Sequence, residues 1–163
     1  MKISAIIDYT ATPQQVFDML VDADFQNRKC VATGAHHYTV SISTRADRTV
    51  VVCHRDMPSD RFPTYVKNMV GETLGVTETQ DWGPAGPGGV RDGRLTVHIA
   101  TAPVSLHGTL SLAPGGQGCV ETIDGDLKAK IPFFGSKIEQ SAAPAIRSAI
   151  RVEGETGTAW LQR

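Results

Sequence analysis

A long helical pattern at the C-terminal end is the feature that most constrains the fold of this chain. Between residues 135 and 163, apolar residues recur at three- and four-residue spacing, and the resulting face is rich in alanine. Pro144 is expected to bend this helix or to break it at Ala143. Gly154 and Gly157 each weaken it by up to ~1 kcal/mol relative to alanine. A helix of this length needs a wide apolar surface to lie on, and the preceding residues must form that surface.

The preceding residues consist of short segments in which apolar and polar side chains alternate. Alternation with a period of two is typical of strands that bury one face. Because the connections between these segments are short, the strands are expected to pair as an antiparallel meander. The strands are predicted over residues 2–10, 37–44, 49–57, 73–82, 93–101, 103–112 and 118–131.

Two short helices are predicted between the first and second strands. Thr12 is expected to cap the first helix, with Pro13 at its first position and a capping box completed three residues after the cap. Asp24 is expected to cap the second helix, which ends near Gly34. Residues 62–71 are predicted to form a small helix or turn. The predicted fold class is therefore α+β, with a seven-stranded antiparallel curved sheet wrapped around the C-terminal helix.

Composition and charge exclude several classes of function. The chain has 163 residues, which suits a single domain over residues 1–163. Its 16 basic and 17 acidic residues are scattered along the chain and give a net charge of -1. The chain therefore has no basic stripe, and binding to nucleic acid is not predicted. No stretch approaches the ~18–20 consecutive apolar residues of a membrane span, and no stable membrane insertion is expected. Residues 1–11 lack the apolar core and cleavage site of a signal peptide, which predicts a cytoplasmic location.

The sequence predicts neither a metal site nor a cofactor. The three cysteines lie far apart and lack the spacing of a zinc site, so they are expected to be free thiols. His98 and His107 are expected to point outward from neighbouring strands as a cross-strand pair. The glycine-rich residues 86–89 lack the lysine and the following helix that a phosphate-binding loop requires.

Several short motifs accompany this order of elements. They are Tyr9-x-Ala11-x-Pro13-x-x-Val16-Phe17; Val70-Gly71-x-x-Leu74 followed by Thr77-Glu78-Thr79-Gln80-Asp81-Trp82; Ala102-Pro103-Val104 leading to Gly108-Thr109-Leu110; Ile131-Pro132-x-x-Gly135-x-Lys137-x-Glu139; and Trp160-Leu161. The order of elements is that of the helix-grip fold. With these motifs the chain resembles the START-like (SRPBCC) superfamily over essentially its whole length, and within it one uncharacterised bacterial family, except that Ala102 stands where a glycine is expected.

This resemblance implies a cavity between sheet and helix but does not imply a particular reaction. Members of the superfamily bind lipids, sterols, polyketides or plant-hormone-like ligands there, and a minority are cyclases or hydroxylating enzymes. The composition agrees with a cavity, because aromatic residues make up only 6% of the chain and small aliphatic side chains must fill the interior. The alternative is that residues 62–71 and the C-terminal helix close the core completely.

The predicted cavity has one polar feature, the pair Arg55 and Glu78. Glu78 shares the apolar face of its strand, and a buried carboxylate must be paired or protonated. Arg55 on the neighbouring strand can pair with it and so form a polar anchor for a ligand. The alternative is that this part of the sheet is open to water and both side chains are solvated. The predicted ligand-binding residues are Arg55, Phe62, Tyr65, Met69, Val76, Glu78, Trp82, Val97, Leu106, Ile138, Ala142, Ile146 and Ile150.

These observations favour the binding or carriage of a small hydrophobic ligand such as a lipid, polyketide or aromatic metabolite. A first alternative is an enzyme of the cyclase or dehydratase kind, for which only Glu78, Tyr65 or Arg55 could supply a general acid or base. A second alternative is a protein-interaction module without a ligand. No residue is assigned a catalytic role from the sequence.

Overall fold

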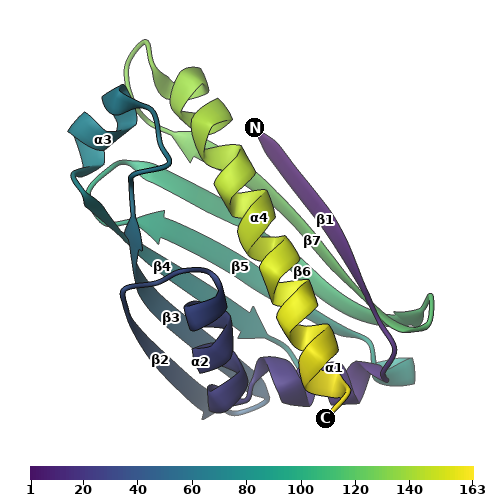
Figure 1. The fold of residues 1–163 in the computed structure, drawn as a ribbon. Coiled ribbons are helices and arrows are strands. Elements are labelled where there is room, and N and C mark those ends of the chain that lie inside the picture. Colours follow the sequence, from purple (N-terminus) through teal and green to yellow (C-terminus); the bar gives the residue numbers. More distant parts are fainter.

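The protein, described here over residues 1–163 by a computed structural model, has one seven-stranded antiparallel sheet (Figure 1). The strand order is β1-β7-β6-β5-β4-β3-β2. The predicted meander is therefore correct for β2 to β7 but wrong for β1, which pairs with β7 and not with β2. The strands are β1 (Lys2–Tyr9), β2 (His37–Arg45), β3 (Arg48–Pro58), β4 (Thr73–Trp82), β5 (Arg91–Ile99), β6 (Val104–Gly115) and β7 (Gly118–Ala129). The helices are α1 (Pro13–Leu20), α2 (Ala23–Ala32), α3 (Thr64–Val70) and α4 (Gly135–Leu161), with a single turn of 3-10 helix, η1 (Pro87–Gly89).

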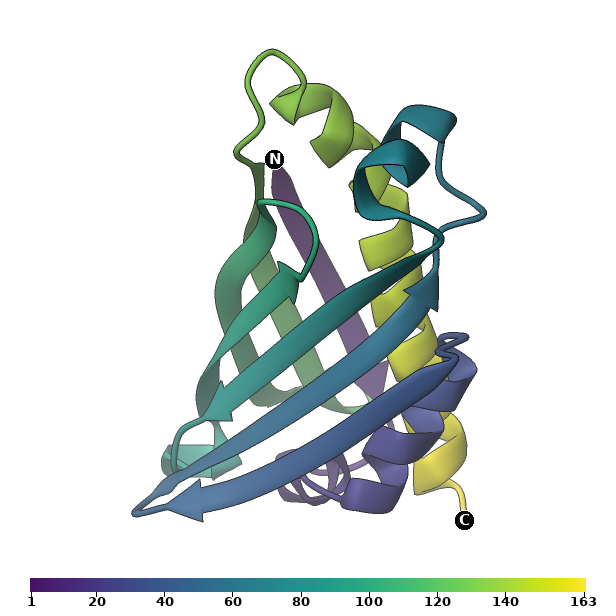
Figure 2. The ribbon, with the colours of Figure 1, turned by 90° about the vertical axis from the view of Figure 1, so that its left-hand side faces the viewer.

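Helix α4 lies diagonally across the concave face of the curved sheet (Figures 1 and 2). Helices α1 and α2 cover the sheet near the C-terminal end of α4, and α3 lies near its N-terminal end. This is the predicted α+β helix-grip fold. Of the two outcomes predicted for Pro144, a bend in the helix or a break at Ala143, the break does not occur, because α4 continues through Pro144.

The chain reversal after β1 follows from local side-chain chemistry. Thr12 and Gln15 form the predicted capping box at the start of α1, with Pro13 in the first turn. Asp22, and not Asp24, caps α2, because its carboxylate accepts hydrogen bonds from the backbone of Asp24 and Phe25. Asp24 instead contributes a negative charge in the first turn, where the helix dipole favours it.

The glycines of α4 allow the helix to approach the first strand closely. A Cβ atom added to Gly157 would lie 2.8 Å from Cε1 of Tyr9 and 2.9 Å from Cε of Met19. At Gly154 the nearest atom to such a Cβ is Cγ2 of Ile7, at 3.0 Å. The two glycines therefore lower the intrinsic helix propensity but permit close packing of α4 on β1 and α1.

The alternation of the strands agrees closely with the prediction. Strand β4 has the predicted limits, while the other strands differ from the prediction mainly at their ends. His98 and His107 are exposed on the outer face with ring centroids 5.3 Å apart, as predicted. The inner face forms one apolar core of 24 buried residues, and a second small core of Cys30, Val51 and Cys53 lies between α2 and β3.

Candidate functional site

The interior between sheet and helices contains two different environments. At the α3 end lies an apolar cavity of about 50 Å³. Near the C-terminal half of α4 lies a charged cluster, formed by Lys29, Arg55, Glu78 and Glu153 and contacted by Gln80. No residue of the cluster lines the cavity.

The apolar cavity is formed by α3, the N-terminal part of α4 and the adjacent ends of three strands. Ten of its eleven lining residues are hydrophobic, and Ser141 is the exception. At ~10–15 Å³ per water molecule it would hold only about three to five waters, whereas ligand pockets measure ~300–1,000 Å³. The lining residues are Phe62, Val66, Met69, Val70, Leu74, Ile99, Ala102, Val104, Ile138, Ser141 and Ala142.

The polar contacts at the edge of this cavity join α3 to α4. The hydroxyl groups of Tyr65 and Ser141 form a hydrogen bond, and the ammonium group of Lys137 lies 4.4 Å from the centre of the Tyr65 ring. At the other side of α3, buried Ser59 hydrogen-bonds to the carbonyl oxygen of Gly71, whose φ of 84° suits glycine. The Ser59–Gly71 hydrogen bond thus joins the two ends of the segment 59–71, and this segment makes few polar contacts with α4.

The charged cluster links two helices to the sheet. Lys29 of α2 donates to Oε1 of Glu78 and to Oε2 of Glu153, each at 2.8 Å. Arg55 of β3 donates to Oε2 of Glu78 at 2.7 Å. Gln80 donates to Glu78 at 3.1 Å and accepts a hydrogen bond from the Trp82 indole at 3.1 Å. The cluster therefore consists of alternating charges that are closely hydrogen-bonded to one another.

The four charged side chains are almost fully buried. Their exposed fractions are 2% for Lys29, 6% for Arg55, 12% for Glu78 and 7% for Glu153. Burial alone would raise the pKa of Glu78, but Lys29 and Arg55 outweigh it and lower this pKa to about 2. Burial alone would also lower the pKa of Lys29, but Glu153 and Glu78 raise it above its ordinary value. Both groups are thus held in their charged forms near neutral pH.

A third buried carboxyl group, Glu121 of β7, lies beside this cluster and differs from Glu78 and Glu153 in having no ion-pair partner. Its side chain is fully buried, Oε1 has no hydrogen-bond partner, and the Tyr9 hydroxyl donates to Oε2 at 3.4 Å. Burial and the negative charge of Glu153 raise the pKa of Glu121 well above its ordinary value, although Lys29 opposes this. The protonated form of Glu121 is thus favoured relative to an exposed carboxyl group, in contrast to Glu78.

The small core beneath α2 contains two of the three free thiols. Cys30 and Cys53 are buried next to each other, and the Cys53 thiol donates to Oε1 of Gln26 at 3.3 Å. The interaction with the adjacent Cys53 thiol lowers the pKa of Cys30 to about 7, and Arg55 and Lys29 act in the same direction against burial. The third thiol, Cys119, is also buried and free, in agreement with the prediction.

The structure brings only some of the predicted ligand-binding residues to the cavity. Phe62, Met69, Ile138 and Ala142 line it, and Tyr65 lies at its edge. The predicted Arg55–Glu78 pair forms and is shielded from water, but it belongs to the charged cluster. Their role in ligand binding stays a prediction. The remaining predicted residues pack in or against the core away from the cavity lining: Val76, Trp82, Val97, Leu106, Ile146 and Ile150.

Sequence patterns did not predict a site role for Lys29, Glu121 or Glu153. Two of them carry a usable signal. Glu153 lies three residues after Ile150 on the apolar face of α4, and Glu121 lies two residues before Ile123 on the inward face of β7. A charged residue on an apolar face indicates a buried polar partner. Lys29 has no comparable signal, since α2 has a mostly polar sequence without a clear apolar face.

No group of three or more His, Cys, Asp or Glu side chains is arranged to hold a metal ion. None of the helices combines the length and the apolar composition needed to cross a bilayer. The two features of the candidate site are thus its apolar cavity and its charged cluster.

The curved sheet and the α4 helix that lies across its concave face define a helix-grip fold (Figure 2). Two solved structures illustrate the shared fold. The Zhui aromatase/cyclase of a Streptomyces species has a TM-score of 0.60 and 13% identity, with 100% of this chain and 93% of that chain covered. Human STARD10 has a TM-score of 0.62 and 11% identity, with 99% and 64% covered.

The chain belongs to the family described as "Protein of unknown function (DUF2505)", whose model matches residues 4–161. An uncharacterised protein of Mycobacterium tuberculosis is 27% identical over 166 residues, which cover 94% of this chain and 92% of the relative. The predicted resemblance to an uncharacterised family is thereby confirmed, and the solved structures share the predicted fold.

Proposed function

We propose that this protein binds one small, mainly apolar molecule in the cavity between α3, the sheet and the N-terminal part of α4. The observation that carries this proposal is the lining, in which ten of eleven residues are hydrophobic. Such a cavity offers water almost no hydrogen-bond partner, so apolar contact is the main interaction available to an occupant. The hydroxyls of Tyr65 and Ser141 are the polar groups nearest to it and suit one oxygen atom of a ligand.

The ligand enters by displacement of α3. A cavity of about 50 Å³ is too small for a lipid, polyketide or bicyclic aromatic molecule, so it must widen on binding. Helix α3 has only seven residues, has no side-chain cap and contacts α4 through the Tyr65–Ser141 hydrogen bond. Its base at Ser59 and Gly71 is fixed by a hydrogen bond. Movement of α3 about this base widens the cavity while the sheet and charged cluster stay in place.

The charged cluster gives the other half of the interior a fixed shape. Glu78 already accepts hydrogen bonds from Lys29, Arg55 and Gln80, so its carboxylate is satisfied, whereas the buried Nε of Arg55 has no hydrogen-bond partner. Its low pKa also makes Glu78 a poor proton donor near neutral pH, which disfavours the cyclase or dehydratase alternative based on this residue. Carriage of a ligand in the cytoplasm is the form of this function that the sequence favours.

The proposal is tested by titrating the purified protein with N-phenyl-1-naphthylamine, an uncharged dye whose fluorescence rises in apolar surroundings. We expect saturable binding of one dye per chain. Ala142→Phe places an aromatic ring in the cavity and should abolish binding. Ala145→Phe makes the same change on the exposed side of α4 and should bind as the wild type does. Equal binding by both variants, with native circular dichroism spectra, would exclude this cavity as the site.

A further inference from the structure

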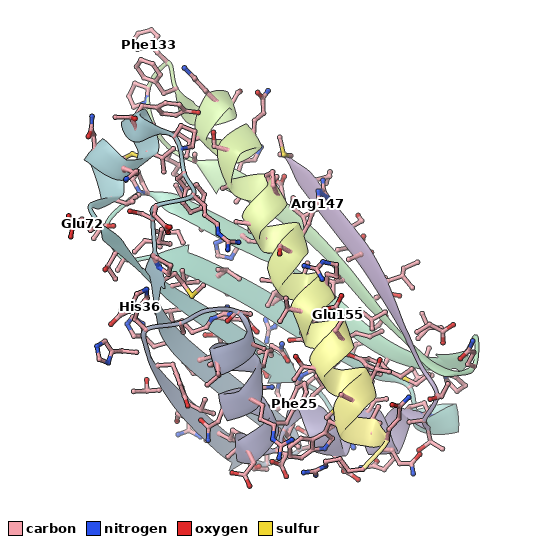
Figure 3. All side chains as sticks on the ribbon, in the orientation of Figure 1. Phe25, His36, Glu72, Phe133, Arg147 and Glu155 are labelled. Atoms are coloured by element: carbon pink, nitrogen blue, oxygen red, sulfur yellow. The ribbon has the colours of Figure 1, made fainter.

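The turn between β7 and α4 exposes two adjacent phenylalanines at one end of the molecule. Phe133 is fully exposed and Phe134 is 55% exposed, whereas most large apolar side chains of the chain are buried. Figure 3 shows Phe133 at the extreme end of the molecule, beyond the first turn of α4. Paired exposed aromatic side chains at a protruding tip are typical of surfaces that contact another apolar phase.

The backbone of this turn holds the aromatic side chains outward. Phe133 has a φ of 66°, a left-handed conformation that an aromatic residue rarely adopts. The amide groups of Phe134 and Gly135 both donate to the carbonyl oxygen of Ile131, which closes the turn. The outward direction of Phe133 is therefore built into a hydrogen-bonded turn and is not the result of a free chain end.

The charge around the tip is positive. Residues 128–137 contain three lysines and no acidic residue, and Lys128, Lys130 and Lys137 are all exposed. The next acidic residue along the chain is Glu139 of α4. Its carboxylate forms an ion pair with the N-terminal ammonium group at 3.4 Å and accepts a hydrogen bond from the Ala129 amide. Asp126, on the other side, contacts the same ammonium group at 3.4 Å and pairs with Lys128 at 3.8 Å, which leaves Lys130 and Lys137 without an acidic partner. On α3 and its flanks, Arg61 and Lys67 balance Asp60 and Glu72.

We propose that this tip, Phe133 and Phe134 with the flanking lysines, docks the protein reversibly on an anionic lipid bilayer. Aromatic rings partition into the interface between head groups and acyl chains, and lysines around them are attracted by the negative surface charge. The tip also lies at the α3 end of the molecule (Figures 1 and 2), and residues of α3 and of the N-terminal part of α4 line the apolar cavity. Docking at this end would bring the cavity next to the bilayer, but it does not depend on the ligand proposal.

Flotation of the full chain with lipid vesicles tests this proposal. The wild type should float with vesicles of phosphatidylcholine and phosphatidylglycerol and should bind weakly to phosphatidylcholine alone. Phe133→Ser should reduce the partition coefficient about tenfold or more, because an interfacial aromatic ring is lost. Lys130→Glu should reduce it by at least about fivefold, and added salt should weaken binding of the wild type.

Two matched controls separate docking from general effects of the substitutions. Ile6→Ser removes another apolar side chain, 72% exposed, from the outer face of β1, and Arg45→Glu reverses a charge at the β2–β3 hairpin. Both variants should bind vesicles as the wild type does. The cavity variant Ala142→Phe should also bind them, so a failure of the ligand proposal leaves this test unaffected.

Three results would overturn the docking proposal. They are the absence of binding to anionic vesicles, equal binding by Phe133→Ser and Ile6→Ser, and binding that is insensitive to Lys130→Glu. Sedimentation velocity without vesicles gives a further criterion. If Phe133→Ser converts a dimer to a monomer and the wild type does not bind vesicles, the tip is a contact between two copies of the chain and not a membrane-binding surface.

Discussion

Replacement of Lys29 by methionine tests the structure most severely among single substitutions. Lys29 is 2% exposed and is the hydrogen-bond partner of both Glu78 and Glu153. After Lys29→Met, Glu78 keeps Arg55 at 2.7 Å, but Glu153 loses its only ion-pair partner. Methionine has a similar length and a similar helix propensity, so the change removes mainly the charge. The variant therefore measures the effect of an isolated buried carboxylate.

The expected loss of stability is large. Removal of one partner from a buried ion pair costs ~3–5 kcal/mol, compared with a total stability of ~5–15 kcal/mol for a domain. For a domain of this size, each kcal/mol lowers the melting temperature by ~2–4 °C, so a decrease of roughly 6–20 °C is expected.

Equilibrium unfolding in urea, followed by circular dichroism and by the fluorescence of Trp82 and Trp160, measures this loss. Arg151→Met is the matched control, because Arg151 pairs with Glu155 on the surface of α4, with both side chains more than half exposed. Such a pair contributes ~0.3–0.5 kcal/mol. The double variant Lys29→Met/Glu153→Gln should recover part of the loss. Equal small losses in Lys29→Met and Arg151→Met would refute the reasoning.

Further predictions concern pH and packing. Glu78 has a pKa of about 2, below its ordinary value of 4.5, so its stabilising contribution should decrease as the pH falls from about 4.5 to 2, which acid titration of the native circular dichroism signal detects. Glu121 has a raised pKa, so it binds a proton in the folded but not in the unfolded chain, and stability should fall as the pH rises above about 4.5. Glu121→Gln should therefore gain stability relative to the wild type between pH 5 and 8, and a constant difference in urea unfolding would contradict this. Gly157→Ala should destabilise by ~1–3 kcal/mol despite its better helix propensity, because the new Cβ would lie 2.8 Å from Tyr9, and a melting temperature at or above that of the wild type would contradict the close packing.

Local patterns in the sequence were sufficient to predict much of the fold. The alternation of β4, from Leu74 to Trp82, depends only on which face is buried, and the sequence shows that face directly. The capping box at Thr12 is likewise a contact between neighbours in the chain. Even the Arg55–Glu78 pair followed from local alternation, because adjacent antiparallel strands place inward side chains side by side.

The charged cluster could not be predicted in the same way, because its geometry depends on tertiary packing. Lys29 belongs to a short, mostly polar helix, and a lysine is almost never fully buried unless it is paired. Its burial results from the packing of α2 against β2, β3 and α4. This packing brings Lys29 within hydrogen-bond distance of Glu78 and Glu153, which lie 49 and 124 positions away in the chain. The cavity volume has the same dependence. Alanine-rich faces predicted a space, but only the packed structure shows that this space is about 50 Å³.

The central claim, that an apolar ligand occupies the cavity under α3, is tested most directly by NMR spectroscopy of protein labelled at methionine and isoleucine methyl groups. Met69 and Ile138 line the cavity, whereas Met19 is buried at the opposite end, beside Gly157. On addition of N-phenyl-1-naphthylamine, we predict intermolecular contacts and shift changes at Met69 and Ile138, with Met19 unchanged. Saturable binding of the dye that leaves Met69 and Ile138 unchanged would contradict the claim.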